Sequence, residues 1–337
     1  MRKQLSCLLV ILVIIKISCF YAMADAAVYQ NGDFSYILTE KGAEITDWKG
    51  WKDGKELPEL IIPSSLDGYP VVGIGKFSMG ISYNFDHRNR FRVVIPEGIQ
   101  YLSESAFSDC MLPTKISLPS TLVNIGESCF FNVIAEIDFP NGSPCFSNDN
   151  GFLVDSRSDT LLYAAPSSYE HQLPDIKRLG NGCLDNWLEE RNAVVLPKTL
   201  TSIGKVFYDL PYLEQVDIPE GLTELSSNSF FATELKNVKL PSSLTEIPAY
   251  CFSGCAVTSI EIAEGVTYIG EYAIYQNMEP IAEVTLPASV QFVGYGAFPE
   301  ETNVIALNGA THFETLEEYC LRCPQSDECK QIKEPKQ

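Results

Sequence analysis

The sequence predicts a β-rich solenoid in which short parallel strands stack in successive coils of about 22 residues. An apolar residue followed by proline recurs along most of the chain, for example at Pro219 and Pro241, which are 22 residues apart. Further apolar residues come three and six positions after the proline, as Leu244 and Ile247 do after Pro241, and the unit closes with Phe252. Many repeated columns in one register favour an array of stacked coils over two ordinary domains.

Each repeat unit has a simple physical interpretation. Residues upstream of the proline alternate between apolar and polar, as in Val238–Leu240, which is typical of a strand with one buried face. Proline then ends the strand, because it has no N–H group to donate to a neighbouring strand. One such unit cannot cover its own apolar side. The units must therefore stack, with each strand pairing in parallel with the next one.

The first 24 residues have the composition of a secretory signal peptide. Arg2 and Lys3 give a basic start, Cys7–Ile15 is an apolar run, and Ala22–Ala24 supplies small residues for cleavage near Ala24–Ala26. The run is too short to span a bilayer, which takes roughly 20 apolar residues. We therefore expect export of the chain, to the exterior, the cell surface or the periplasm.

Lipoprotein anchoring through Cys19 is an alternative to simple secretion. Lys16, however, occupies a position where the lipid-attachment motif requires an apolar residue. We expect cleavage of the signal peptide without lipidation.

The net charge of −20 argues against two classes of partner. Nucleic acids and anionic membranes would be repelled by such a surface. Beyond the signal peptide, no segment is long and apolar enough to predict a membrane span. We interpret the negative charge as a property that keeps the protein soluble.

Residues 25–58 lack the repeat and are predicted to form an N-terminal β cap. Phe34–Leu38 alternates like a strand, and Gly42–Trp48 is its expected hairpin partner. Trp48 and Trp51 would cover the open end of the first coil, as terminal repeats must. Exposed tryptophans would also suit stacking on carbohydrate.

The solenoid is expected to span residues 59–307. Its pattern, apolar-x-apolar-Pro-x-x-apolar-x-x-Ile-Gly-x-x-small-Phe, is similar to the BspA-like leucine-rich repeat family of secreted and surface proteins. Asp67–Gly75 resembles the first coil of that family. The resemblance covers residues 30–307 and implies a curved leucine-rich-repeat solenoid, which convention places in the α/β horseshoe class although this sequence is β-rich with few helices. It also implies export and binding of host proteins or other cells, with no catalytic residues and no cofactor.

Two interruptions depart from the array. Residues 78–90 lengthen the first coil and contain His87, Arg88 and Arg90. Residues 141–169 form the larger insertion, in which 151–155 and 160–163 are predicted to pair as a β-hairpin. After Leu307 the repeat stops, and residues 308–337 are expected to be a C-terminal cap and tail with a short helix over 315–321.

Three cysteines, Cys129, Cys183 and Cys251, occupy the column just before the phenylalanine. Other coils place alanine, serine or valine there, so this column requires a small buried residue and these thiols are predicted to be packed and reduced. Cys110 and Cys255 share the position three residues after the phenylalanine and are expected to pack similarly.

The tail cysteines lie outside these columns. In an exported protein, we expect a disulfide bridge between Cys320 and Cys323 or between Cys323 and Cys329, and the cysteine left over would pair with Cys145 or stay free. Together with His312, the three tail cysteines could instead form a zinc site, although no metal is expected.

Nothing in the sequence predicts catalysis, since His87, His171 and His312 lie in three separate regions. The sequence favours a non-enzymatic, exported protein that binds another protein on the exposed face of its strands. A carbohydrate-binding role through Trp48, Trp51 or Tyr163 is the alternative. The alternation of the strands nominates the following outward-facing residues: Lys115, Ser117, Glu136, Asp138, Gln215, Asp217, Asn237, Lys239, Ser259, Glu261, Glu283 and Thr285.

Overall fold

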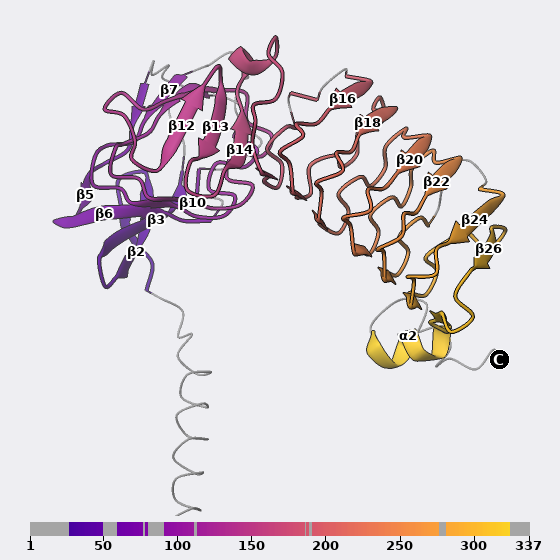
Figure 1. Ribbon diagram of the computed structural model, residues 1–337. Helices are drawn as coiled ribbons and strands as arrows, with labels where there is room; N and C mark the ends of the chain where they lie inside the picture. The colour runs from indigo at the N-terminus through magenta and orange to yellow at the C-terminus, as the bar shows by residue number, and fades with distance from the viewer. Residues whose placement is uncertain are drawn as a thin grey trace, which may run out of the picture.

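The computed structural model is a β-solenoid of about ten coils that begins with an antiparallel sheet and ends with a short helix (Figure 1). It describes residues 27–49, 59–76, 78–79, 91–110, 113–185, 187–188, 191–275 and 281–323. The predicted signal peptide, Cys19 and Trp51 lie outside the described residues.

One ladder of parallel strands follows the alternating segments that precede each proline. We call it the first-strand ladder. It is interrupted at the insertion and at two places in the C-terminal half, and strands that pair lie about 22 residues apart, such as Asn237 and Ser259. The strands are β4 (Glu59–Ile61), β7 (Phe91–Val94), β9 (Pro113–Ser117), β11 (Glu136–Asp138), β16 (Ala193–Val195), β18 (Gln215–Asp217), β20 (Asn237–Lys239), β22 (Ser259–Glu261), β24 (Glu283–Leu286) and β26 (Asn303–Ala306).

The structure also contains a second-strand ladder, which the sequence analysis did not predict. Most of its strands have only two residues, too few for alternation to be recognised in sequence. They carry the apolar residue six positions after the proline, such as Ile247, which pairs with Ile269 of the next coil. The strands are β6 (Tyr69–Ile74), β8 (Tyr101–Leu102), β10 (Asn124–Ile125), β15 (Arg178–Leu179), β17 (Ser202–Ile203), β19 (Glu224–Leu225), β21 (Glu246–Ile247), β23 (Tyr268–Ile269), β25 (Phe292–Val293) and β27 (His312–Phe313).

Glycine after the second strand allows consecutive coils to approach closely. A Cβ atom on Gly270 would lie 2.4 Å from the backbone nitrogen of Ala249 in the preceding coil. The backbone N–H of Gly270 donates a 2.8 Å hydrogen bond to the carbonyl of Ile247 in that coil, so the two coils cannot separate without losing this bond. Glycine is therefore required where two coils approach this closely, whereas Ser103 and Ser226 occupy the same position in other coils and donate the equivalent hydrogen bond.

We expect Gly270→Ala to destabilise the protein by about 1–3 kcal/mol or more, because the added methyl group would overlap backbone atoms. Gly309→Ala is the matched control, since a Cβ atom there meets nothing within 4 Å. Urea unfolding of both variants measures the difference. Equal stability of the two variants would contradict this account of the glycine column.

The phenylalanine column forms a stack through the core of the C-terminal half. The rings of Phe207 and Phe230 lie 5.0 Å apart with an interplanar angle of 3°, and Phe230 and Phe252 lie 5.2 Å apart at 6°. Cys129, Cys183 and the other column cysteines are free and buried, as predicted. Burial raises the pKa of the Cys129 thiol to about 12, so this thiol is unreactive.

The N-terminal cap matches its predicted hairpin and adds one strand. β2 (Phe34–Thr39) pairs antiparallel with β3 (Gly42–Trp48), and β1 (Tyr29–Asn31) pairs with β2. β3 then joins the solenoid by parallel pairing with β6, while β5 (Ser65–Leu66) pairs antiparallel with β6. The cap thus extends the second-strand ladder.

The predicted hairpin of the insertion is present, as β13 (Phe152–Asp155) and β14 (Thr160–Ala164), and β12 (Phe146–Asp149) extends it to three antiparallel strands. We call these three strands the junction sheet. It lies between the N-terminal coils and the C-terminal coils (Figure 1). β14 also pairs in parallel with β15, so it takes one place in the second-strand ladder. The 3₁₀ helix η1 (Pro166–Ser168) follows it.

The junction sheet divides the interior into two cores. Leu153 and Tyr163 pack in the core of the N-terminal coils, whereas Phe152 and Leu161 pack in the core of the C-terminal coils. Alternation along β13 sends Phe152 and Leu153 to opposite sides. Leu161 and Tyr163 are two residues apart, and they reach different cores because the register of β14 shifts between them at a β-bulge. The insertion is therefore a wall between two cores.

The C-terminal cap contains the predicted helix. α2 (Leu316–Arg322) begins after Thr315, whose side chain accepts a hydrogen bond from the backbone N–H of Glu318, and the Glu318 side chain bonds back in a capping box. Arg322 forms ion pairs with Glu271 and Glu314 at 3.2 and 3.0 Å. These contacts fasten the helix to the last coils.

Both predicted bridges involving Cys323 are wrong. Cys320 is disulfide-bonded, but Cys323 and Cys145 are free. Cys323 follows the last helical residue, and its backbone N–H donates to Tyr319 at 2.8 Å. It is held by the helix end, and three-residue spacing in sequence does not by itself bring two sulfur atoms into bonding geometry.

Candidate functional site

The twelve nominated residues all lie in the first-strand ladder, but they do not form one open face. Those in β18, β20, β22 and β24 are exposed. Those in β9 and β11 are half-buried or buried, and the nomination of Ser117 is wrong because this side chain is only 6% exposed. The nominated face is thus open only in the C-terminal half.

Contacts with the insertion and with neighbouring strands explain the difference. Ser167 donates to the Glu136 carboxylate through its backbone N–H at 2.8 Å and its hydroxyl at 2.6 Å. Lys115 Nζ lies 2.6 Å from Asp138. In the N-terminal half, the polar side chains of the ladder therefore contact other parts of the same chain.

In the C-terminal half, four nominated residues come together around one groove. β18 and β20 belong to separate sheets, and between them lies a hollow of about 550 Å³. Gln215 and Asp217 line one side, and Asn237 and Lys239 line the other. Exposed charges of both signs thus face a gap in the ladder where backbone hydrogen bonding between the strands is interrupted.

The aromatic residues proposed for carbohydrate do not support that role. Trp48 is 7% exposed and packs edge-on against Phe91, with ring centroids 6.0 Å apart. Tyr163 is 2% exposed, and burial raises the pKa of its phenol. Neither ring can offer a face to a sugar. The carbohydrate hypothesis is therefore wrong at both of these positions.

The Tyr163 hydroxyl instead satisfies backbone groups at the break between the two halves. It lies 2.8 Å from the carbonyl oxygen of Val133 and accepts a 3.1 Å hydrogen bond from the N–H of Ala135. In regular coils the corresponding carbonyl receives a backbone N–H, as Thr233 does from Ala256. At the break, the Tyr163 hydroxyl therefore supplies the hydrogen bond that a neighbouring coil would otherwise provide.

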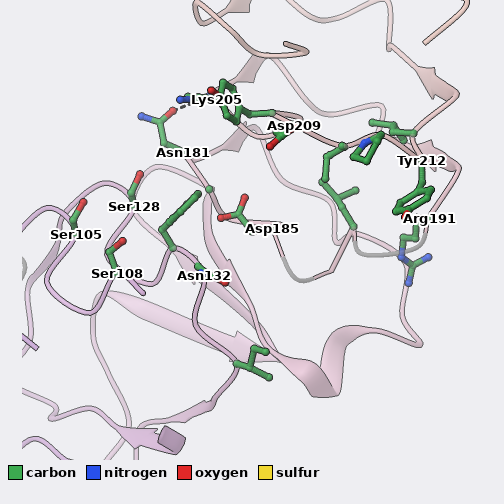
Figure 2. Close-up of a pocket in the computed structure, with 18 residues that line it drawn as sticks. Ser105, Ser108, Ser128, Asn132, Asn181, Asp185, Arg191, Lys205, Asp209 and Tyr212 are labelled. Carbon is green, nitrogen blue, oxygen red and sulfur yellow. Dashed lines mark hydrogen bonds between the residues drawn. The ribbon is translucent and has the colours of Figure 1, made fainter. Parts of the chain in front are cut away.

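A second hollow, the junction pocket, lies where the N-terminal coils meet the C-terminal coils and has a volume of about 740 Å³. Figure 2 shows Ser105, Ser128 and Asn132 on one side and Lys205 and Asp209 on the other, with Asp185 between them. The wall also includes the following residues: Ser108, Phe131, Ile134, Asn181, Gly182, Leu188, Arg191, Tyr208, Leu210, Pro211, Tyr212 and Leu213.

Asp185 connects the two halves across the pocket. One carboxylate oxygen is hydrogen-bonded to the backbone N–H of Asn132, while Oδ2 is buried without a partner. Burial raises the pKa of Asp185 to about 7, offset in part by the Asn132 N–H and by Lys205 and reinforced by Asp109. In regular coils the equivalent backbone N–H donates to a carbonyl of the next coil, as the N–H of Asp209 does to the carbonyl of Phe231. At the junction, the Asp185 carboxylate is the acceptor instead.

A glycine makes room for the aromatic wall of the pocket. Gly182 has a φ of +64°, and a Cβ atom there would lie 2.8 Å from the ring of Phe131. Several other coils place serine, asparagine or tyrosine at this left-handed position, including Ser128 and Asn228, whereas the last coil has Gly296. The glycine therefore leaves space for the Phe131 ring at the junction. Phe131 is 39% exposed.

Sequence reasoning did not find the junction pocket. The available signals were the replacement of the column phenylalanine by Leu184 and the irregular spacing that follows the insertion. Neither signal indicates that coils on both sides of the insertion would share a pocket.

The described histidines are not arranged for catalysis. His171 follows η1, whereas His312 lies in β27, where its Nε2 is 3.5 Å from Glu318. His87 lies outside the described residues. Within the described part of the chain, no three metal-ligating side chains gather around one point, and no helix is long and apolar enough to cross a membrane.

Comparison with protein families decides the classification of the chain. The model described as the BspA type leucine rich repeat region matches in six copies, over residues 81–150, 177–305 and 245–334. The chain belongs to the BspA-type leucine-rich repeat family.

Several solved structures are similar to this BspA-type chain. A leucine-rich cell surface protein from Faecalibacterium prausnitzii is 16% identical, with 88% of this chain and 98% of that chain covered and a TM-score of 0.39. A leucine-rich repeat protein from Eubacterium ventriosum is 15% identical, with 83% and 95% covered and a TM-score of 0.43. One from Bacteroides ovatus is 17% identical, with 85% and 99% covered and a TM-score of 0.35.

No curated protein matches the chain. The similar structures give no information about what this BspA-type protein binds. Its function must be argued from its own surfaces.

Proposed function

We propose that the chain is an exported, non-enzymatic binding protein that captures a protein ligand on the open part of its first-strand ladder. The groove between β18 and β20 is the observation that carries this proposal. Exposed Asp217 and Lys239 flank it, and Glu261 continues the same face on β22, where it lies 4.0 Å from Lys239. Such exposed pairs contribute little to stability, so their charges remain available to a partner.

Three further observations support a macromolecular ligand. The exposed strands follow one another along one edge of the C-terminal half (Figure 1), which offers an extended surface of the kind that repeat proteins use for binding. Charges of both signs alternate there, and this arrangement gives specificity through complementarity. Membership of a repeat family without a recurring catalytic set agrees with binding rather than chemistry.

Export is part of the proposal and rests on residues 1–24, which lie outside the described residues. Their basic start and apolar run are typical of a secretory signal. Secretion of the full-length chain, with cleavage near Ala24–Ala26, is the expected outcome.

Reversing the charges of the strand face should abolish ligand capture. The combined change Asp217→Lys, Lys239→Glu and Glu261→Lys is expected to lower retention of the protein ligand at least tenfold, because unlike charges at the contact become like charges. Retention is measured by pull-down from the natural surroundings with the mature chain, followed by affinity measurement on the captured protein.

A matched control changes the same net charge elsewhere. Lys198→Glu, Glu246→Lys and Glu300→Lys alter three exposed residues outside the groove. If both triple variants retain the ligand equally, the strand face is not the binding surface.

A further inference from the structure

The junction pocket has the dimensions of a ligand site and differs in charge from the rest of the molecule. Its volume of about 740 Å³ falls in the range of small-molecule sites, roughly 300–1,000 Å³. Among the described residues, its lining contains two carboxylates, Asp185 and Asp209, and two cations, Arg191 and Lys205, so this part of the lining is charge-balanced in a chain of net charge −20.

Both cations are already engaged by the protein. The Arg191 guanidinium stacks 3.9 Å from the ring centroid of Trp187, and its Nε donates to the Trp187 carbonyl at 2.9 Å. Lys205 Nζ lies 3.7 Å from the centroid of Tyr208. Because both cations lie against aromatic rings and two carboxylates line the same pocket, the described lining has no net charge that would favour a polyanion or a basic peptide. The balance favours an uncharged ligand.

Two aromatic rings remain open to such a ligand. Tyr212 is 66% exposed and Phe131 is 39% exposed, and both line the pocket. Tyr208, by contrast, has Lys205 near its ring and stacks on Phe231 at 5.1 Å. Exposed rings in a recess offer flat apolar surfaces, which stack on the faces of other rings.

Hydrogen-bonding groups surround these rings. Asn132 donates through Nδ2 to Asp109 at 3.0 Å, which fixes the orientation of its amide oxygen as an acceptor. The Asp209 carboxylate is exposed and accepts no hydrogen bond from the described residues, and the half-buried hydroxyl of Ser128 lies on the opposite wall (Figure 2). Acceptors and hydroxyls beside aromatic faces complement a ligand that has both hydroxyl groups and C–H surfaces.

A neighbouring hollow of about 470 Å³ continues the pocket, with Ser128 and Asn181 common to both. It is lined by the hydroxyl groups of Ser158, Thr160 and Ser202, and by the Arg178–Glu224 pair, whose atoms lie 3.1 Å apart. The two hollows together give room for a linear chain of several small polar units.

We propose that the junction pocket binds a neutral oligosaccharide, with Phe131 and Tyr212 stacking on sugar faces and Asn132 and Asp209 hydrogen bonding to sugar hydroxyls. The oligosaccharide extends past Asn181 into the neighbouring hollow. This site is separate from the strand face, so it adds a second ligand class to the proposed function.

The experiment applies the full chain to an array of neutral and acidic glycans, followed by calorimetric titration with the neutral oligosaccharide that binds best. We expect binding of a neutral oligosaccharide of three or more units, with an affinity that does not change with salt concentration. Tyr212→Ala should weaken binding about tenfold, and Asn132→Ala should weaken it as well. Tyr69→Ala, at a tyrosine that is 47% exposed elsewhere, should have no effect.

Other outcomes would overturn the proposal. These are the absence of any bound neutral glycan, binding that Tyr212→Ala leaves unchanged, or preference for a lysine-rich peptide that is lost at high salt. The charge-reversed strand-face variant should retain glycan binding. If this variant loses the protein ligand but still binds the glycan, the two proposals are tested independently of each other.

Discussion

Phe230→Ala is expected to destabilise the C-terminal half of the solenoid by about 3–5 kcal/mol, the usual cost of removing a buried phenylalanine ring. Phe230 is fully buried, and its ring is stacked between Phe207 and Phe252 at 5.0 and 5.2 Å. Its removal therefore weakens two coil interfaces at once, and stability in a solenoid is carried by such nearest-neighbour interfaces. Urea unfolding, together with hydrogen exchange, measures the loss.

The adjacent residue gives the control. Phe231 is half-buried and stacks on Tyr208 at 5.1 Å, outside the column. Phe231→Ala should cost much less, and hydrogen exchange in the N-terminal coils should be unchanged in both variants because their core is separate. Similar losses at the two positions would show that the stacked column does not dominate the core.

Asp185→Asn is expected to stabilise the protein, increasingly as the pH rises from about 4 to 7. The folded-state pKa of Asp185 is raised from 3.8 to about 7, because its carboxylate is buried at the junction. A raised acid pKa means that the fold prefers the protonated form, so the cost of burial is absent at low pH and complete above about pH 7. At 1.4 kcal/mol per pKa unit, that cost is about 4 kcal/mol.

Asparagine does not titrate, and its amide oxygen can still accept the hydrogen bond from Asn132. The measurement compares the free energy of unfolding of the variant and the parent chain between pH 4 and 8. Asp209→Asn removes one negative charge from the same pocket and controls for net charge. Parallel pH profiles for Asp185→Asn and the parent chain would show that the carboxylate is not buried as described.

The regular part of the fold was predictable because local and long-range requirements agree there. Alternation in Val238–Leu240, proline at position 241 and the closing Phe252 each have one physical role, and the same roles recur in neighbouring coils. The buried state of Cys251 followed from its column, because the other occupants are small. Because similar coils stack on one another, the structure expected for one repeat supports the same structure for its neighbours.

The candidate sites were less predictable because they depend on the break in the array. The sequence correctly indicated a hairpin in the insertion, but not that Tyr163 would turn inward and satisfy Val133 and Ala135. Asp185 and Asn132 are separated by the whole insertion, yet they are neighbours in space. Repeat patterns describe what one coil does to the next, and they contain no information about contacts across an interruption.

The tail provides a second example. The sequence predicted the helix correctly, because capping signals are local and Thr315 precedes Glu318 at the required spacing. It did not predict which cysteine is bonded, because the geometry of a disulfide depends on how two segments meet. Cys320 is bonded while Cys323 is free.

The constant register of the coils bears on how such a chain can change during evolution. Val238 pairs with Ile260, and Val194 pairs with Val216, each 22 residues further along. A deletion or duplication of one such unit in the gene would join equivalent positions of neighbouring coils and leave every remaining interface intact. The C-terminal half can therefore vary in length at little cost. The junction sheet, which contributes to both cores, has no equivalent neighbour and cannot be lost in this way.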